Sequence, residues 1–108
     1  MLVLTLDGTP CEINEREILY FSSYRNTIHV HTEKGEYIYP TSLSELHDAY
    51  STIGFEKLDR SNVVNVNNIS EYDAIRKVVK FGASDKYTVV SEPNEKKVKK
   101  LLEDREKQ

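Results

Sequence analysis

The feature that most restricts the fold of this chain is a rapid succession of short β-type segments separated by turn signals. The clearest segment is residues 27–32, Thr-Ile-His-Val-His-Thr, in which apolar and polar side chains alternate. A period of two is typical of a strand with one buried and one exposed face. Arg25-Asn26 before this segment and Lys34-Gly35 after it are expected turns. Closely spaced hairpins therefore indicate a fold dominated by strands.

Strand-forming residues recur along most of the remaining chain. We expect strands at residues 2–6, 11–13, 18–21, 27–32, 37–39, 55–66, 69–75, 78–81 and 87–90. Asp7-Gly8 and residues 82–85 supply turn signals between neighbouring segments.

The sequence predicts a helix in the middle of the chain, beginning at Ser42 and ending at Gly54. Ser42 and Glu45 have the spacing of a capping box, in which each side chain accepts from the backbone N–H of the other residue. The residues that form one apolar stripe on this helix are Leu43, Leu46 and Tyr50. A glycine is a common residue just past the end of a helix.

A second helix is expected from Pro93 to about residue 105. Proline suits the first helical position, because the N–H that it lacks would have no partner there. Val98, Leu101 and Leu102 recur at helical spacing and form one narrow apolar seam. The chain is therefore expected to contain many strands, one short helix in the middle and one helix at its end.

Length and composition limit the class of protein. The 108 residues suit a single domain spanning residues 1–108. The apolar share is 38% and the charged share is 31%, which favours a thin or elongated core. No stretch approaches the ~20 apolar residues of a membrane span, and the first residues do not resemble a signal peptide. Cys11 is the only cysteine, so we expect a reduced, cytoplasmic setting and no internal disulfide.

The net charge of −3 does not by itself indicate a nucleic-acid-binding protein, but the charge is unevenly distributed. Residues 1–54 carry three basic and eight acidic side chains, whereas residues 55–108 carry twelve basic and ten acidic ones. Solvated faces produce such asymmetry more often than binding sites do, so the pattern alone assigns no partner.

The usual signs of an enzyme or a metal protein are missing from the sequence. There is no Gly-x-Ser-x-Gly elbow and no glycine-rich phosphate loop. His29 and His31 could begin a zinc site, but strand alternation explains them as residues of the exposed face. We therefore expect no catalytic residues, no bound metal and no cofactor.

One stretch carries a more specific signal. Residues 54–69 read Gly-Phe-Glu-Lys-Leu-Asp-Arg-Ser-Asn-Val-Val-Asn-Val-Asn-Asn-Ile. This run resembles the signature of LytTR (LytR/AlgR-type) DNA-binding domains, in which a Gly-Phe pair precedes Arg-Ser, an apolar pair, an Asn and an Ile. Residues 17–21, 28–35, 42–46 and 87–91 are similar to other segments of that family, in the same order. The resemblance extends from about residue 12 to residue 102.

The resemblance implies a mainly β, elongated fold of about ten short strands in small antiparallel sheets, with the two helices described above. It also implies a bacterial transcription regulator that contacts DNA through loops between strands. Two such loops would enter successive major grooves, and one would touch the minor groove between them. Carried over by position, the DNA-binding residues are Arg25 and Asn26 in the first loop, Arg60, Ser61 and Asn62 in the second, and Asn94, Lys96 and Lys97 in the third.

The residue chemistry supports two of these loops more strongly than the third. Arg can read guanine and Asn can read adenine through paired hydrogen bonds. For Arg60, a structural salt bridge with Asp59 is the alternative to a DNA contact. In the third loop, Glu92 and Pro93 occupy positions where a basic residue is usual, so Lys96 and Lys97 could belong to an ordinary solvated helix face.

The expected partner is therefore double-stranded DNA, at promoter sites that form paired repeats. Without a heptad seam of useful length, we expect a monomer in solution, with two copies meeting only on DNA, and no membrane association. The alternative function is a protein-interaction module on the same scaffold that does not bind DNA. The sequence does not decide between a stand-alone regulator and one domain of a larger regulator.

Overall fold

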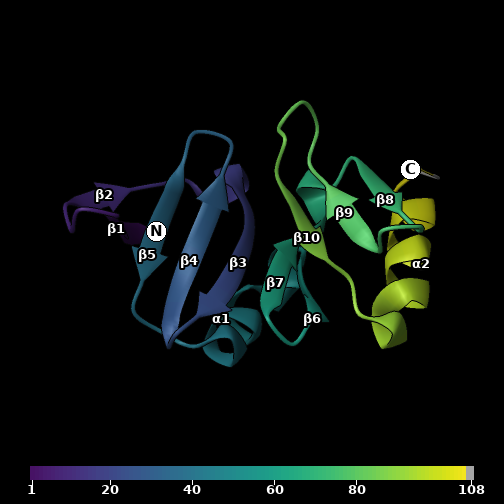
Figure 1. Ribbon diagram of the computed structural model, residues 1–108, viewed down its shortest axis with the longest axis horizontal. Coiled ribbons are helices and arrows are strands. Elements are labelled where there is room, and N and C mark those ends of the chain that lie inside the picture. Colours follow the sequence, from purple (N-terminus) through teal and green to yellow (C-terminus); the bar gives the residue numbers. More distant parts are fainter. Residues whose placement is uncertain (107–108) are drawn as a thin grey trace.

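A computed structural model describes residues 1–106 of the chain. Its described part contains ten strands and two α-helices and measures 40 × 26 × 24 Å along its principal axes (Figure 1). The strands form two antiparallel sheets within these residues, of seven and three strands. The expected mainly β, elongated architecture is confirmed, although most of the strands belong to one larger sheet.

The larger sheet has the strand order β2-β1-β5-β4-β3-β7-β6. Its members are β1 (Leu2–Thr5), β2 (Pro10–Glu12), β3 (Ile18–Tyr24), β4 (Thr27–Thr32), β5 (Glu36–Tyr39), β6 (Phe55–Asp59) and β7 (Asn62–Asn65). The smaller sheet has the order β10-β9-β8 and consists of β8 (Glu71–Asp73), β9 (Val78–Lys80) and β10 (Tyr87–Val89). The helices are α1 (Leu43–Tyr50) and α2 (Glu95–Glu106), with short 3-10 turns at Glu15–Glu17, Ser51–Ile53, Val66–Asn68 and Glu92–Asn94.

Two expected strands differ most from the structure. The expected strand at residues 55–66 is divided into β6 and β7 by a turn at Arg60 and Ser61. The expected strand at residues 69–75 is shorter, because the Asp73 carboxylate accepts the backbone N–H groups of Ile75 and Arg76 and turns the chain.

Helix α1 has half of the expected capping box. The Ser42 hydroxyl accepts the backbone N–H of Glu45 at 3.2 Å. The Glu45 carboxylate accepts the hydroxyl of Thr41 instead of returning to Ser42. After α1 and its 3-10 extension, Gly54 takes φ +96°, a left-handed conformation that favours glycine.

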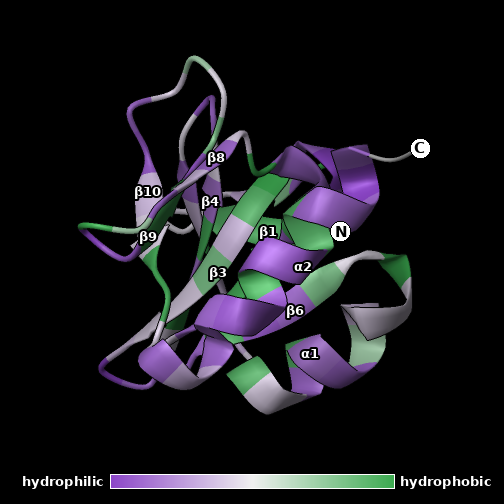
Figure 2. Ribbon diagram, turned by 90° about the vertical axis from the view of Figure 1, so that its right-hand side faces the viewer, coloured by the Kyte–Doolittle hydropathy of each residue, from purple (hydrophilic) through white to green (hydrophobic). Residues whose placement is uncertain are grey.

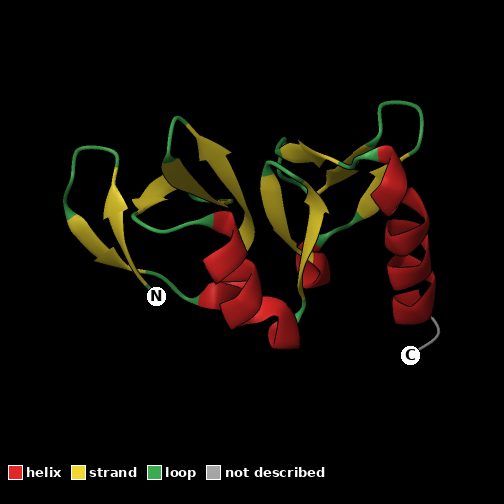
Figure 3. Cartoon of the chain, turned by 90° about the horizontal axis from the view of Figure 1, so that it is seen from below, coloured by secondary structure: helices red, strands yellow, loops and turns green. Residues whose placement is uncertain are grey.

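The domain has two hydrophobic cores that meet at β3 and β7. The first lies between α1 and the larger sheet and includes Phe21, Leu46 and Val63. The second lies beneath α2 and includes Leu19, Leu58, Val64, Phe81 and Val98. Figure 2 shows α2 with a mainly hydrophilic surface, as expected for a helix that buries one narrow seam. Figure 3 shows α2 at one end of the molecule and the N-terminal hairpin at the other.

The two strand histidines do not lie on an open face, and that expectation is wrong. The side chains of His29 and His31 are only 22% and 13% exposed. His31 stacks on Tyr20 with ring centroids 4.1 Å apart, and its Nε2 lies 2.8 Å from the Ser22 hydroxyl. Burial lowers the pKa of His31 from its usual 6.5 to about 4, against the opposing attraction of Glu36 for the proton. It also raises the pKa of Tyr20 to about 12.

The lowered pKa of His31 predicts a loss of stability in mild acid. The unfolded chain takes up a proton on this residue below pH 6.5, whereas the folded chain does so only near pH 4. The stabilising contribution is therefore complete above pH 6.5 and is lost as the pH falls towards 4. We expect a loss of about 2 kcal/mol over this range, since part of the ring still meets solvent. Urea unfolding at several pH values measures it.

The control for this prediction is a His31→Phe variant, which keeps a ring against Tyr20 but has no titrating group. The difference in stability between this variant and the original chain should change with pH by the amount that His31 contributes. If the difference is the same at pH 7.5 and pH 5, His31 does not cause the acid sensitivity.

Candidate nucleic-acid interface

Three connections between elements lie next to one another along one edge of the molecule. The β3–β4 turn and the β6–β7 turn are neighbours because β3 pairs with β7, and the Ser23 N–H donates to the Ser61 carbonyl at 3.1 Å. The connection from β10 to α2 lies against β6, where the Ser91 N–H donates to the Leu58 carbonyl at 2.9 Å. In Figure 1 all three follow the lower edge, along the long axis of the molecule. The fold thus brings the three sequence-predicted loops together.

The β3–β4 turn presents Arg25 and Asn26 to solvent. Tyr24 pairs with Thr27, so these two residues form the whole loop of the hairpin. Both have positive φ, +49° and +64°, as a tight type I′ hairpin turn requires. The Arg25 guanidinium lies over the Tyr24 ring, 5.2 Å from its centroid. The stacked ring leaves the guanidinium hydrogen atoms available to a ligand.

The β6–β7 turn presents Arg60, which is exposed and forms no ion pair with any residue of 1–106. The expected alternative, a salt bridge with Asp59, is not formed. The Asp59 carboxylate instead accepts the backbone N–H of Ser61 at 3.0 Å, together with its hydroxyl. Asp59 therefore shapes the turn, and Ser61 is partly buried with its hydroxyl occupied.

Asn62 does not fit the predicted role of a DNA contact, because its side chain is buried. The residue is 1% exposed. Its Nδ2 donates to the Thr88 hydroxyl at 2.9 Å and to the Val89 carbonyl at 2.8 Å, and its Oδ1 accepts the Leu58 N–H at 3.3 Å. Asn62 thus joins β6, β7 and β10 in the interior and cannot reach a ligand from this position.

The three residues predicted for the third loop have different surroundings. Lys96 is exposed and forms no ion pair within the described chain. The Lys97 ammonium lies 2.9 Å from the Glu56 carboxylate and 3.4 Å from the Lys57 carbonyl. The Asn94 Nδ2 donates to the Leu58 carbonyl at 3.1 Å and to the Ser91 hydroxyl at 2.8 Å. Of these three residues, Lys96 alone forms no side-chain hydrogen bond or ion pair within residues 1–106.

A basic residue that the sequence did not indicate lies beside the third loop. The Lys77 ammonium is 2.6 Å from the Glu92 carboxylate, and this contact lowers the pKa of Glu92 and raises that of Lys77. Lys77 ends the β8–β9 turn with φ +57°, and its carbonyl accepts the N–H of Val90. The acidic charge of the third loop is thus balanced by a residue from another hairpin, which the pairing of β9 with β10 and the Val90–Lys77 hydrogen bond bring close.

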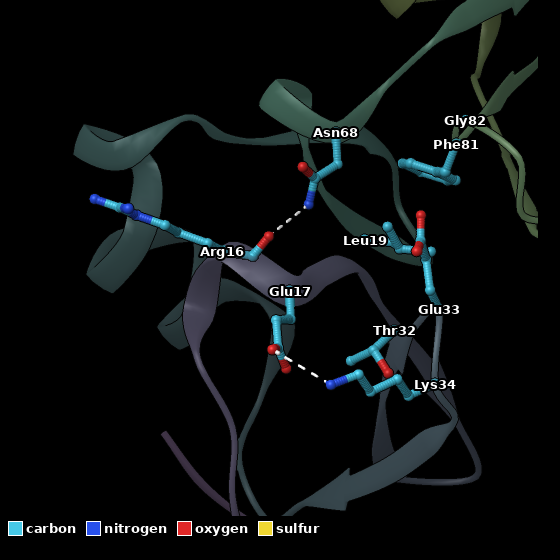
Figure 4. A pocket seen from close by; sticks show the side chains of 9 residues that line it. All are labelled: Arg16, Glu17, Leu19, Thr32, Glu33, Lys34, Asn68, Phe81 and Gly82. Atoms are coloured by element: carbon cyan, nitrogen blue, oxygen red, sulfur yellow. Dashed lines mark hydrogen bonds and ion pairs between the residues drawn. The ribbon is translucent and has the colours of Figure 1, made fainter.

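Two hollows of the surface are lined by residues outside the three loops. One of about 320 Å³ lies where β4 ends, at the opposite end of the sheet from the Arg25 turn. Figure 4 shows that Glu17 and Lys34 face each other there, 3.9 Å apart, while the Arg16 side chain points away. A hollow of about 750 Å³ is lined by Asn14, Glu15, Arg16, Tyr50, Ile53, Phe55, Asn65, Asn67 and Asn68.

No group of three or more His, Cys, Asp and Glu side chains in residues 1–106 is arranged to hold a metal ion. Among the same residues, no helix is long and apolar enough to cross a membrane.

Comparison with known proteins identifies a family and a similar solved structure. The family model of the LytTr DNA-binding domain matches residues 11–103. A solved chain from Bacillus cereus, described as the LytTr DNA-binding domain of a methyl-accepting/DNA response regulator, superimposes with a TM-score of 0.78. The two chains are 23% identical, and the match covers 94% of each. No curated protein matches the chain.

Proposed function

Because the chain belongs to the family of LytTr DNA-binding domains, we propose that it binds double-stranded DNA sequence-specifically and regulates transcription. The observation that carries the proposal is the row of three adjacent connections with exposed basic or amide side chains: Arg25 and Asn26, then Arg60, then Lys96. The long axis of 40 Å is sufficient to follow one face of a duplex across about one helical turn, ~34 Å. The first and third loops enter successive major grooves, and Arg60 enters the minor groove between them.

The proposal gives the exposed residues different tasks. A contact to a base edge determines sequence preference, whereas a contact to a phosphate determines position. Arg25 and Asn26 suit base reading in the major groove, where each base pair has a distinct pattern of donors and acceptors. Arg60 contributes affinity with little preference, because the minor groove distinguishes few base pairs. Lys96 binds phosphate.

The rival function is a protein-interaction module that has lost DNA binding. Its support is the net charge of −3 and the acidic Glu92 in the third loop. The Lys77–Glu92 contact weakens this argument, because it balances the acidic charge where the DNA backbone would pass. Binding to duplex that weakens steeply with rising salt favours the DNA-binding function.

The proposal also concerns assembly and location. The apolar seam of α2 is used within the domain, since Val98 is buried and Leu101 and Leu102 pack against the second core. We therefore infer a cytoplasmic monomer that meets a second copy only on paired DNA repeats. Titration of a duplex with two repeats should then give two chains per duplex.

Selection of binding sites from random duplexes, followed by titrations at several salt concentrations, tests the proposal. Arg25→Ala or Asn26→Ala should cost about 1–3 kcal/mol on the selected site and relax the preference at one base pair. Arg60→Ala should lower the affinity for all duplex sequences by a similar factor. Lys96→Ala should also act uniformly and lower the slope of log affinity against log salt by about one.

Lys34→Ala is the matched control, because Lys34 is an exposed cation at the opposite edge of the sheet. It should change neither affinity nor preference. Failure of the original chain to retain any duplex at low salt would refute DNA binding, and equal losses from Lys34→Ala and Lys96→Ala would refute the assigned edge.

A further inference from the structure

The backbone of Leu58 is the point at which the second and third proposed DNA-contact loops are joined. Its N–H donates to the buried Asn62, as described above. Its carbonyl accepts three donors from the third loop: the Ser91 N–H at 2.9 Å, the Ser91 hydroxyl at 3.2 Å and the Asn94 Nδ2 at 3.1 Å. Leu58 itself is fully buried and lies two residues before Arg60. Asn62 therefore accepts the N–H of Leu58, and Asn94 donates to the carbonyl of the same residue.

We propose that Asn94 is a positioning residue, which fixes the distance and orientation between the Arg60 turn and the start of α2 and does not itself contact DNA. The inference rests on the DNA-binding function proposed above. It replaces the expected role of Asn94 as a DNA contact with an indirect one, exerted through Ser91 and Leu58.

The hydrogen bonds of Asn94 support this assignment over a phosphate contact. A side-chain amide has two N–H groups, and those of Asn94 are directed at the Leu58 carbonyl and the Ser91 hydroxyl. The remaining atom is an acceptor oxygen, which cannot hydrogen-bond a phosphate oxygen because both are acceptors. A phosphate contact would require Asn94 to give up its hold on the loop.

A positioning role matters here because the spacing of DNA grooves is fixed. Loops that enter neighbouring grooves bind best when they already have that spacing. If they do not, the free energy needed to move them into place lowers the affinity. The 3-10 turn before α2 is joined to β6 by the Asn94 amide, and α2 itself is joined to β6 by the contact of Lys97 with Glu56. Of these two contacts, the hydrogen bond from Asn94 lies nearer to Arg60 along the chain, because Asn94 bonds to Leu58. Lys97 contacts Glu56 and Lys57, which lie further from Arg60.

The test compares Asn94→Ala with Lys96→Ala in the full chain, on one selected duplex, over a series of salt concentrations. Asn94→Ala should weaken binding about three- to tenfold, the value of one or two hydrogen bonds, and leave the salt slope unchanged. Lys96→Ala should lower the slope by about one. Circular dichroism and thermal unfolding are used to choose a temperature at which each variant is folded.

A second variant, Ser91→Ala, removes one donor to the same carbonyl and should behave like Asn94→Ala, which protects the test if Asn94→Ala folds poorly. A fall in salt slope with Asn94→Ala would identify a direct phosphate contact and overturn the proposal. Unchanged affinity in both variants would also overturn it. If the original chain binds no duplex although it is folded, the proposed DNA-binding function is refuted, and the inference about Asn94 is refuted with it. If the original chain binds and only the variant results differ from expectation, the inference alone is refuted.

Discussion

Replacement of Asn62 by leucine should lower the free energy of unfolding by about 3 kcal/mol. The substitution keeps the branched shape of the side chain, with larger methyl groups in place of the amide, and removes its three hydrogen bonds in the interior. The Leu58 N–H, the Thr88 hydroxyl and the Val89 carbonyl would then lose their partner, and each unsatisfied buried group is costly. Urea unfolding followed by circular dichroism measures the loss.

Asn67→Ala is the matched control for Asn62, because the Asn67 amide donates to the Ile53 carbonyl at the exposed surface. Its cost should be less than about 1 kcal/mol, since water can replace a surface partner. If the Asn62 variant loses no more than this control, the buried amide does not hold β6, β7 and β10 together as described.

Replacement of Phe81 by alanine should cost about 3–5 kcal/mol, because it opens a cavity in the second core. Phe81 is 1% exposed and lies 5.6 Å from the Tyr20 ring, measured between centroids. The loss of stability should affect the whole domain, because β7 contributes to both cores. Val63 packs in the first core and its neighbour Val64 packs in the second. Tyr87→Ala, at a side chain that is 60% exposed, should cost far less.

Tyrosine fluorescence and far-ultraviolet circular dichroism should report one shared unfolding transition in the Phe81 variant, because the two cores cannot separate without breaking β3 and β7. Two separate transitions would contradict this view and would mean that α2 and the smaller sheet unfold independently of the larger one.

The parts of the fold that sequence predicted best are those determined by neighbouring residues. Alternation at residues 27–32 and the turn signal at Arg25 and Asn26 depend on a hairpin whose strands are joined by only two residues. The stripe that buries Leu43 and Leu46 is likewise local to one helix. In such cases the period of the apolar side chains and the turn residues define the element together.

The features that sequence did not predict depend on contacts between distant segments. Asn62 meets Thr88 and Val89, which follow it by 26 and 27 residues, and Asn94 reaches Leu58 across 36. An asparagine that is buried and satisfied looks the same in sequence as one that is exposed. Sequence does not predict the burial of His31 for the same reason, because alternation does not reveal that Tyr20 covers its ring.

The three predicted loops lie next to one another in the structure, but sequence could not distinguish the side chains that contact the protein itself from those that are free. The β3–β4 and β6–β7 turns could be foreseen, since short turns between paired strands project into solvent. The contribution of Lys77 could not, because its contact with Glu92 links a turn of the smaller sheet to the start of α2. Which side chains remain free for DNA stays a prediction for the experiments above.

The two-residue turn at Arg25 and Asn26 has a further consequence for the thermodynamics of recognition. A loop of this length between paired strands has almost no alternative backbone conformations to lose. The Tyr24 ring also restricts the Arg25 side chain before any ligand arrives. DNA association through this loop, as proposed above, is then opposed by little conformational entropy, because the loop is preorganised.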